Sequence, residues 1–163
     1  MMRSRLAAHC ITMCAALALL IGAPGRARAE APSANCTFIE IEASLEPGKE
    51  VSIPAELRGM EKKLKKPPFA SWNRFVVKSR AQKTLSAQKP ESIKLELGAA
   101  SAMLRDVEGS GKRPRYSLAL TVDDPSGKRV VDTKVSLTAG DYVVIGRALA
   151  DNRGHLLAQT CSK

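Results

Sequence analysis

Residues 116–135 have the sequence YSLALTVDDPSGKRVVDTKV, which holds two alternating segments and a turn between them. Leu118, Leu120 and Val122 alternate with small or polar side chains, and this period of two is typical of a strand with one buried face. The intervening Asp-Pro-Ser-Gly at 124–127 contains the residues that β-turns favour. The stretch therefore predicts an antiparallel hairpin.

Similar segments recur on both sides of this hairpin, with turn-forming residues between most of them. The predicted strands are 36–44, 72–79, 92–97, 102–107, 116–122, 131–135, 142–145 and 156–158. About eight short strands with turns every 8–12 residues are typical of all-β domains. We therefore expect a mainly β fold, an antiparallel β-sandwich or barrel, in a single domain.

One short α-helix is expected on the N-terminal side of the domain, after an N-cap at Ser52 and before Pro67-Pro68. Its apolar positions recur at helical spacing, and they are Leu57, Met60 and Leu64. Gly59 lies in its middle and weakens the expected helix by about 1 kcal/mol relative to alanine.

Residues 1–29 have the three-part order of a cleavable secretory signal peptide. Basic residues come first, an apolar run covers 13–21, and small residues stand at Ala27 and Ala29. A membrane-spanning helix needs about 20 apolar residues, and this run is much shorter. Cleavage after Ala29 leaves a domain at 30–163 and lowers the net charge from +10 to +6, because it removes four basic and no acidic residues.

Two cysteines remain in the processed chain, Cys36 near its start and Cys161 near its end. An exported protein meets an oxidising compartment, so this even pair predicts a disulfide between the first and last strands. A loop of this length corresponds to about 4–5 kcal/mol in chain-entropy models. That is a large share of the net stability of an ordinary domain.

The most distinctive local feature is a basic segment at 58–66, which carries a net charge of +4. Its basic residues are Arg58, Lys62, Lys63, Lys65 and Lys66. Such a face attracts anionic material, so these residues are the candidates for binding an anionic envelope component, a membrane surface or an acidic protein partner. The alternative is a solvated helix face in which Glu61 and Lys65 form an ordinary pair.

Aromatic residues are few, which argues against nucleic acid as a partner, because single-strand binders stack bases on aromatic rings. The same shortage argues against a carbohydrate platform. That objection is weaker, since one exposed ring at Trp72 or Tyr142 is enough for a sugar.

The sequence contains no recognisable catalytic apparatus, and we expect neither a metal nor a cofactor. His155 is the only histidine after residue 29, and Glu40 and Glu42 alternate as solvent-facing strand residues do. The pairs Asp123-Asp124 and Asp151-Asn152 are better explained as turns than as calcium ligands.

The stretch 62–69, KKLKKPPF, followed by an aromatic strand, resembles uncharacterised exported bacterial proteins. In these, a short basic helix that ends in Pro-Pro-Phe precedes a run of β-strands. The resemblance implies an envelope location and brings no activity or site residues with it.

These observations favour a non-catalytic, exported envelope protein, periplasmic or extracellular, that binds a partner or assists an assembly. Two alternatives stay open. A small periplasmic hydrolase would need a pocket that gathers His155 with a serine and a carboxylate. A purely structural subunit would need an apolar edge strand or a large exposed apolar patch.

Overall fold

The computed structural model describes residues 31–109 and 111–163, so the predicted signal peptide and its cleavage site lie outside the described residues. The strands are β1 (Ser33–Ser44), β2 (Arg74–Ser86), β3 (Pro90–Leu95), β4 (Gly98–Glu108), β5 (Arg115–Asp123), β6 (Arg129–Thr138), β7 (Val143–Ala148) and β8 (Arg153–Ser162). The helical elements are η1 (Ala55–Met60), α1 (Glu61–Leu64) and η2 (Phe69–Ser71), of which η1 and η2 are 3₁₀ turns.

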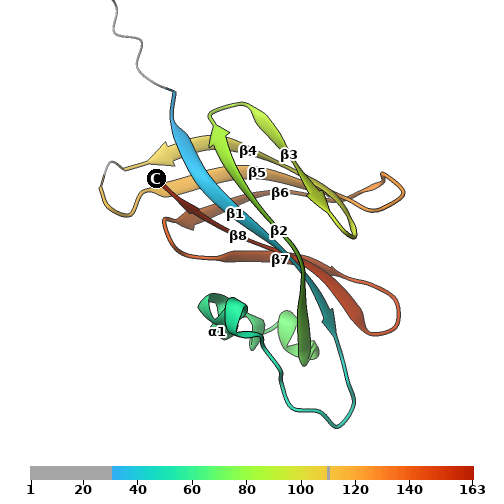
Figure 1. The fold of residues 1–163 in the computed structure, drawn as a ribbon. Helices are drawn as coiled ribbons and strands as arrows, with labels where there is room; N and C mark the ends of the chain where they lie inside the picture. The colour runs from blue at the N-terminus through green and yellow to red at the C-terminus, as the bar shows by residue number, and fades with distance from the viewer. Residues whose placement is uncertain (1–30, 110) are drawn as a thin grey trace, which may run out of the picture.

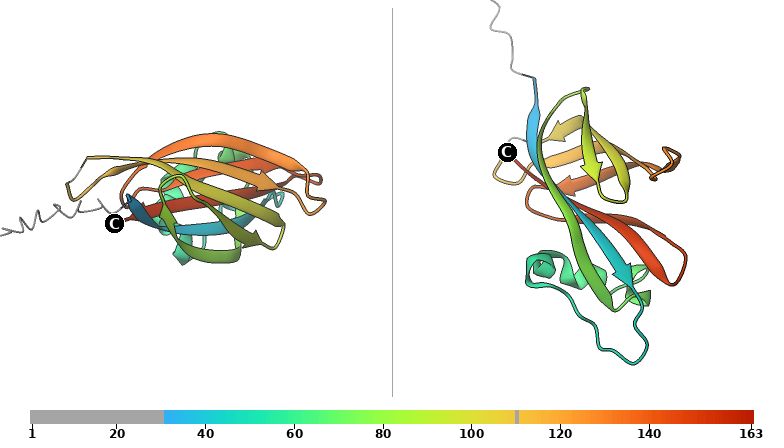
Figure 2. Two further views of the ribbon diagram at one scale, coloured as in Figure 1. Left: turned by 90° about the horizontal axis from the view of Figure 1, so that it is seen from above. Right: turned by 45° about the vertical axis from the view of Figure 1, so that its right-hand side comes forward.

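The strands form two four-stranded antiparallel sheets. Sheet A has the order β2-β1-β8-β7 and sheet B has the order β3-β4-β5-β6. The two sheets face each other and do not close into a barrel, as Figures 1 and 2 show. The prediction of a mainly β antiparallel fold is confirmed, and the arrangement is that of a sandwich.

The main core lies between the sheets. Along β5, Tyr116, Leu118 and Leu120 point inward, as their alternation predicts. They meet Phe38 of β1 and Leu157 of β8 from the opposite sheet. This apolar contact holds the two sheets together.

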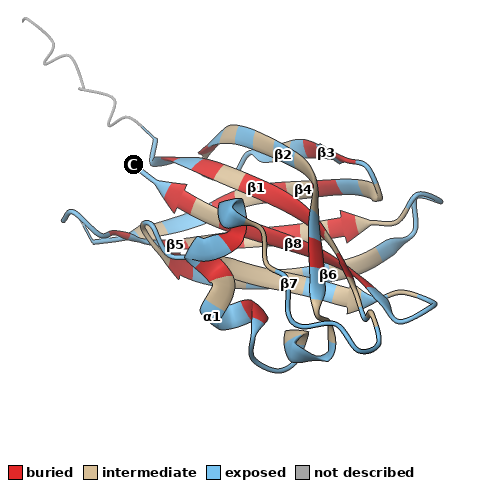
Figure 3. Ribbon diagram, turned by 60° about the horizontal axis from the view of Figure 1, so that its bottom comes forward, coloured by how far each residue is buried: buried red, intermediate tan, exposed pale blue. Residues whose placement is uncertain are grey.

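A third layer covers the other face of sheet A. Leu57, Met60 and Leu64 from η1 and α1 are buried there against apolar residues of β1 and β8, including Ile41 and Leu156. The β1–β8 pair is therefore covered on both faces, and Figure 3 shows buried residues along most of both strands. Side chains on both faces of these strands are consequently buried.

The local structure of the helical segment differs from the prediction. Ser52 does not cap a helix; its backbone N–H instead donates to the carbonyl of Asn73, at 2.6 Å. The segment begins at Ala55 as a 3₁₀ turn, and only Glu61–Leu64 is α-helical. The three predicted apolar positions are nevertheless the buried ones, because packing on sheet A selects them.

Gly59 has a packing role that its low helix propensity does not indicate. A Cβ atom at this position would lie 2.8 Å from Cε2 of Tyr142. The missing side chain thus lets the Tyr142 ring approach the helical segment closely.

Several strand boundaries also differ from the prediction; β2, for example, extends to Ser86, seven residues beyond its predicted end. Phe69–Ser71 forms a 3₁₀ turn, so β2 begins only at Arg74 and Trp72 lies outside it. Leu97 was expected to continue the third strand, but it lies in the turn between β3 and β4.

The predicted disulfide between Cys36 and Cys161 is present. The two residues are direct partners in the β1–β8 ladder, with their Cα atoms 4.1 Å apart, and both side chains are buried. The bond joins the two chain-end strands, which lie side by side at one end of the molecule in Figure 1.

Replacing both cysteines with alanine should lower the free energy of unfolding by about 2–5 kcal/mol, because the unfolded chain regains the freedom that the bond removes. Urea titrations followed by circular dichroism measure this difference. Reductant should lower the unfolding midpoint of the wild type and leave that of the double variant unchanged. An unchanged midpoint in both proteins would show that the bond does not stabilise the fold.

Candidate functional site

The five predicted basic side chains are all exposed. Arg58 lies in η1, Lys62 and Lys63 lie in α1, and Lys65 and Lys66 follow directly. We call this surface the basic segment. Its apolar positions are buried against sheet A, so the backbone that carries the charges is fixed to the core (Figure 1).

Most of these charges have no acidic partner. Lys65 pairs with Glu61 at 2.5 Å, and this contact lowers the pKa of Glu61. Within the described residues, no carboxylate lies at ion-pair distance from Arg58, Lys62, Lys63 or Lys66. The expected Glu61–Lys65 pair therefore forms and leaves four cations facing solvent.

A second site was not expected from the sequence. Glu40 was interpreted as a solvent-facing strand residue, and this interpretation is wrong, because its exposed fraction is 0%. The residue shares its strand face with Cys36 and Phe38, and that face points toward sheet B. Glu42, on the same face, is only half-buried.

The carboxylate of Glu40 accepts four hydrogen bonds. Its Oε2 accepts from the hydroxyl of Ser79 at 2.6 Å and from the backbone N–H of Glu96 at 2.7 Å. Its Oε1 accepts from the N–H of Leu97 at 2.8 Å and from Nε2 of His155 at 3.0 Å. Both oxygens are thus fully used, which is the condition for burying a carboxylate at tolerable cost.

Four separate parts of the chain meet at this carboxylate. Glu40, Ser79 and His155 come from β1, β2 and β8 of sheet A, whereas the two amides belong to the β3–β4 turn of sheet B. A β-bulge in β2 shifts the register next to Glu40, so that Ser79 stands directly opposite it. The Glu40 cluster therefore fastens the β3–β4 turn to sheet A.

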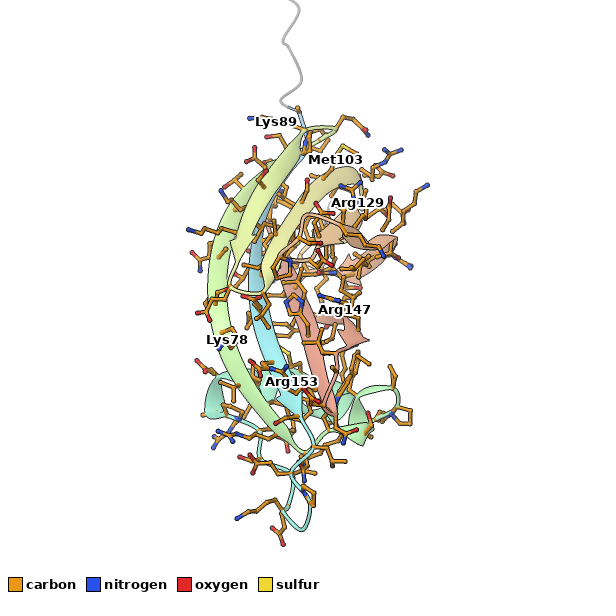
Figure 4. The ribbon with its side chains drawn as sticks, turned by 90° about the vertical axis from the view of Figure 1, so that its right-hand side faces the viewer. Lys78, Lys89, Met103, Arg129, Arg147 and Arg153 are labelled. Atoms are coloured by element: carbon orange, nitrogen blue, oxygen red, sulfur yellow. A yellow bond between two sulfur atoms is a disulfide. The ribbon has the colours of Figure 1, made fainter. Side chains whose placement is uncertain are left out.

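Charged side chains reinforce this junction at its exposed side. The ammonium of Lys78 lies 3.3 Å from Glu96 in the turn and 3.7 Å from Glu42 of β1. Arg153 of β8 also reaches Glu42, at 3.7 Å, and Figure 4 shows where Lys78 and Arg153 lie along sheet A. These exposed pairs add little free energy individually but hold the turn in one orientation.

The hydrogen bonds decide the ionisation of Glu40. Burial by itself raises the pKa of this carboxyl, but the bonds from His155, Ser79 and the amides of Glu96 and Leu97 together lower it from 4.5 to about 2. The ionised form accepts all four hydrogen bonds, whereas the O–H of a protonated carboxyl group would point at another donor and lose a bond. Glu40 is therefore a stably ionised, buried group at neutral pH.

His155, Ser79 and Glu40 are the residue types that the hydrolase alternative requires, but their order differs from that of a nucleophilic triad. The carboxylate stands between the other two, so the Ser79 hydroxyl donates to Glu40 and not to the imidazole. Because an ionised carboxylate only accepts, Nε2 of His155 carries the proton in this contact. The cavity beside His155 has a volume of about 10 Å³, too little for more than one water molecule.

A sequence signal for this cluster existed. Cys36 and Phe38 are residue types that are commonly buried, and Glu40 lies on the same strand face, two residues after Phe38. The alternation was instead assigned from Ile39 and Ile41, which pack under the helical segment on the opposite face. Only the second covering layer, the helical segment, explains why residues on both faces of β1 are buried.

Within residues 31–109 and 111–163, no three histidine, cysteine or acidic side chains gather as a metal site would require. None of the helices in this part of the chain is long and apolar enough to cross a bilayer. Comparison of the chain with protein-family models, with curated proteins and with solved structures finds no match.

Stability should fall as the pH is lowered from about 4.5 toward 2, because Glu40 is ionised in the folded protein down to a pKa of about 2 and must be protonated below it. The depressed pKa corresponds to roughly 3 kcal/mol of stability at neutral pH, which is lost across this window. Glu40→Gln should lower the free energy of unfolding by a similar amount at pH 7, because an amide nitrogen would face two donors. It should also reduce the dependence of stability on pH between about 4.5 and 2, because the glutamine side chain does not titrate.

Glu42→Gln is the matched control, since Glu42 lies two residues along the same face but makes only partly exposed ion pairs. It should lower the free energy of unfolding by less than about 1 kcal/mol. Chemical denaturation at several pH values measures both variants. Equal losses for the two would show that the four-bond cluster has no special role.

Proposed function

We propose that this protein is a non-catalytic binding module of the bacterial envelope that contacts an anionic surface or an acidic partner through the basic segment. The observation that supports this is a set of four solvent-facing cations on a segment anchored to the core, none of which has an acidic partner among the described residues. They are Arg58, Lys62, Lys63 and Lys66. Cations held on a rigid support attract anions without losing much conformational freedom on binding.

The structure also limits how such contact would work. An amphipathic helix binds membranes by inserting its apolar face, but here Leu57, Met60 and Leu64 are buried against sheet A. Only the charged side of the segment is available. Contact with an anionic surface would therefore be peripheral and electrostatic, and it would disappear at high salt.

The predicted export of the protein agrees with the proposal. The Cys36–Cys161 bond is compatible with an oxidising compartment, and the signal-like residues 1–29 predict entry into one. Anionic lipids and acidic polysaccharides are both exposed in the envelope, and both offer the negative charge that the basic segment matches. The periplasm and the cell exterior both satisfy this argument.

The test compares binding to phosphatidylcholine vesicles with and without phosphatidylglycerol, and to soluble polygalacturonate, at low and high salt. Changing Arg58, Lys62, Lys63 and Lys66 to Gln leaves the Glu61–Lys65 pair intact. Binding to the anionic materials should weaken by up to about a thousandfold, since each of the four basic residues near an anionic surface contributes about 1 kcal/mol.

A charge-matched control changes Lys94, Arg105, Lys128 and Lys134 to Gln; these exposed residues lie on sheet B and its β5–β6 turn. This variant loses the same net charge and should bind nearly as well as the wild type. Equal weakening in both variants would assign the effect to overall charge. Absence of salt-dependent binding to all of these materials would end the proposal.

A further inference from the structure

A pocket opens on the outer face of sheet A, at the end where β7 turns into β8. Its volume is about 400 Å³, within the range of small-molecule sites. Residues from the end of β1, from η2 and the following residue, and from the β7–β8 hairpin surround it. They are Leu45, Ser71, Trp72, Ala148, Leu149, Asp151, Asn152 and Arg153.

Trp72 forms the aromatic wall of this pocket, and Gly154 fixes its position. A Cβ atom at Gly154 would lie 2.5–2.8 Å from three neighbouring atoms of the indole ring, so the ring lies face-on against the backbone of β8. Any larger residue at 154 would displace it. Trp72 remains half-buried, and none of the hydrogen bonds of the described residues involves its indole N–H.

The other side of the pocket is polar. Asp151 and Asn152 both have positive φ, at 57° and 55°, in the two-residue turn of the hairpin. The carbonyl of Asn152 accepts from the N–H of Leu45 at 3.2 Å, which ties the turn to the end of β1. Arg153 stands next in sequence, with its guanidinium 3.9 Å from Asp151.

We propose that this pocket, which we call the Trp72 pocket, binds a neutral saccharide. A sugar ring has an apolar C–H face that stacks on an aromatic ring and a rim of hydroxyls that both donate and accept. The Trp72 pocket offers a ring beside the residues Asp151 and Asn152, whose carboxylate and amide types together supply both kinds of hydrogen-bonding partner.

The charge of the lining favours a neutral ligand. Among the described residues, the charged ones that line the pocket are Asp151 and Arg153, whose signs are opposite, so the lining has no net charge to favour an anion or a cation. None of its lining residues belongs to the basic segment. The proposal is therefore independent of the proposed anionic contact, and either can fail without the other.

The chain supplies its own probe, since Trp72 is its only tryptophan. Titration with maltotriose, cellotriose and chitotriose, three neutral oligosaccharides of different linkage and substitution, should change the tryptophan fluorescence of the folded protein for at least one of them. The same ligand should shift backbone amide signals of the β7–β8 hairpin in NMR spectra.

The decisive variant changes Asp151 and Asn152 to Gly, because glycine accepts positive φ and so removes the polar side chains while retaining the turn. This variant should bind at least tenfold more weakly. Gly154→Ala should also weaken binding by displacing the ring. The four-residue basic-segment variant should bind the oligosaccharide as the wild type does.

Two results would overturn the proposal. One is the absence of any fluorescence or hairpin NMR change with all three oligosaccharides. The other is undiminished binding by the Asp151→Gly/Asn152→Gly variant when its circular dichroism spectrum and unfolding midpoint match those of the wild type.

Discussion

The β1–β8 pair is covered by sheet B on one face and by the helical segment on the other, and the rest of the structure depends on this double burial. Along most of its length, a strand pair in this position has no face on which charged residues meet water. Glu40 and His155 nevertheless lie there, and they are buried together at 3.0 Å. The β1–β8 strand pair also carries the disulfide, and Cys36 lies four residues before Glu40 along β1.

The Glu40 cluster provides hydrogen-bond acceptors for backbone groups that lie between the two sheets. The β3–β4 turn of sheet B has two backbone N–H groups directed at sheet A, and an apolar surface there would leave them without partners. The carboxylate satisfies both and simultaneously orders Ser79 and His155. A buried ionic group of this kind adds specificity to the packing of the two sheets, because only one position of the turn satisfies every bond.

Both proposed binding surfaces use the same support. The basic segment rests on β1 and β8 through Leu57, Met60 and Leu64, and Trp72 rests on the backbone of β8 at Gly154. Each surface is a connecting segment held in place by regular strands, which is how loops usually acquire binding roles. The two surfaces differ in chemistry: one presents several solvent-facing cations, and the other combines a ring with polar residues.

The sequence by itself determined the strand pattern, the disulfide, the apolar positions of the helical segment and the turns at 124–127 and 151–152, because these follow from local periodicity, local turn chemistry and cysteine count. It did not determine where Glu40 points, since alternation defines two faces but not how many of them are covered. Likewise, Gly59 and Gly154 carry no local signal for the rings that pack on them. Only the tertiary structure decided these features, because each arises from contacts between residues far apart in the chain.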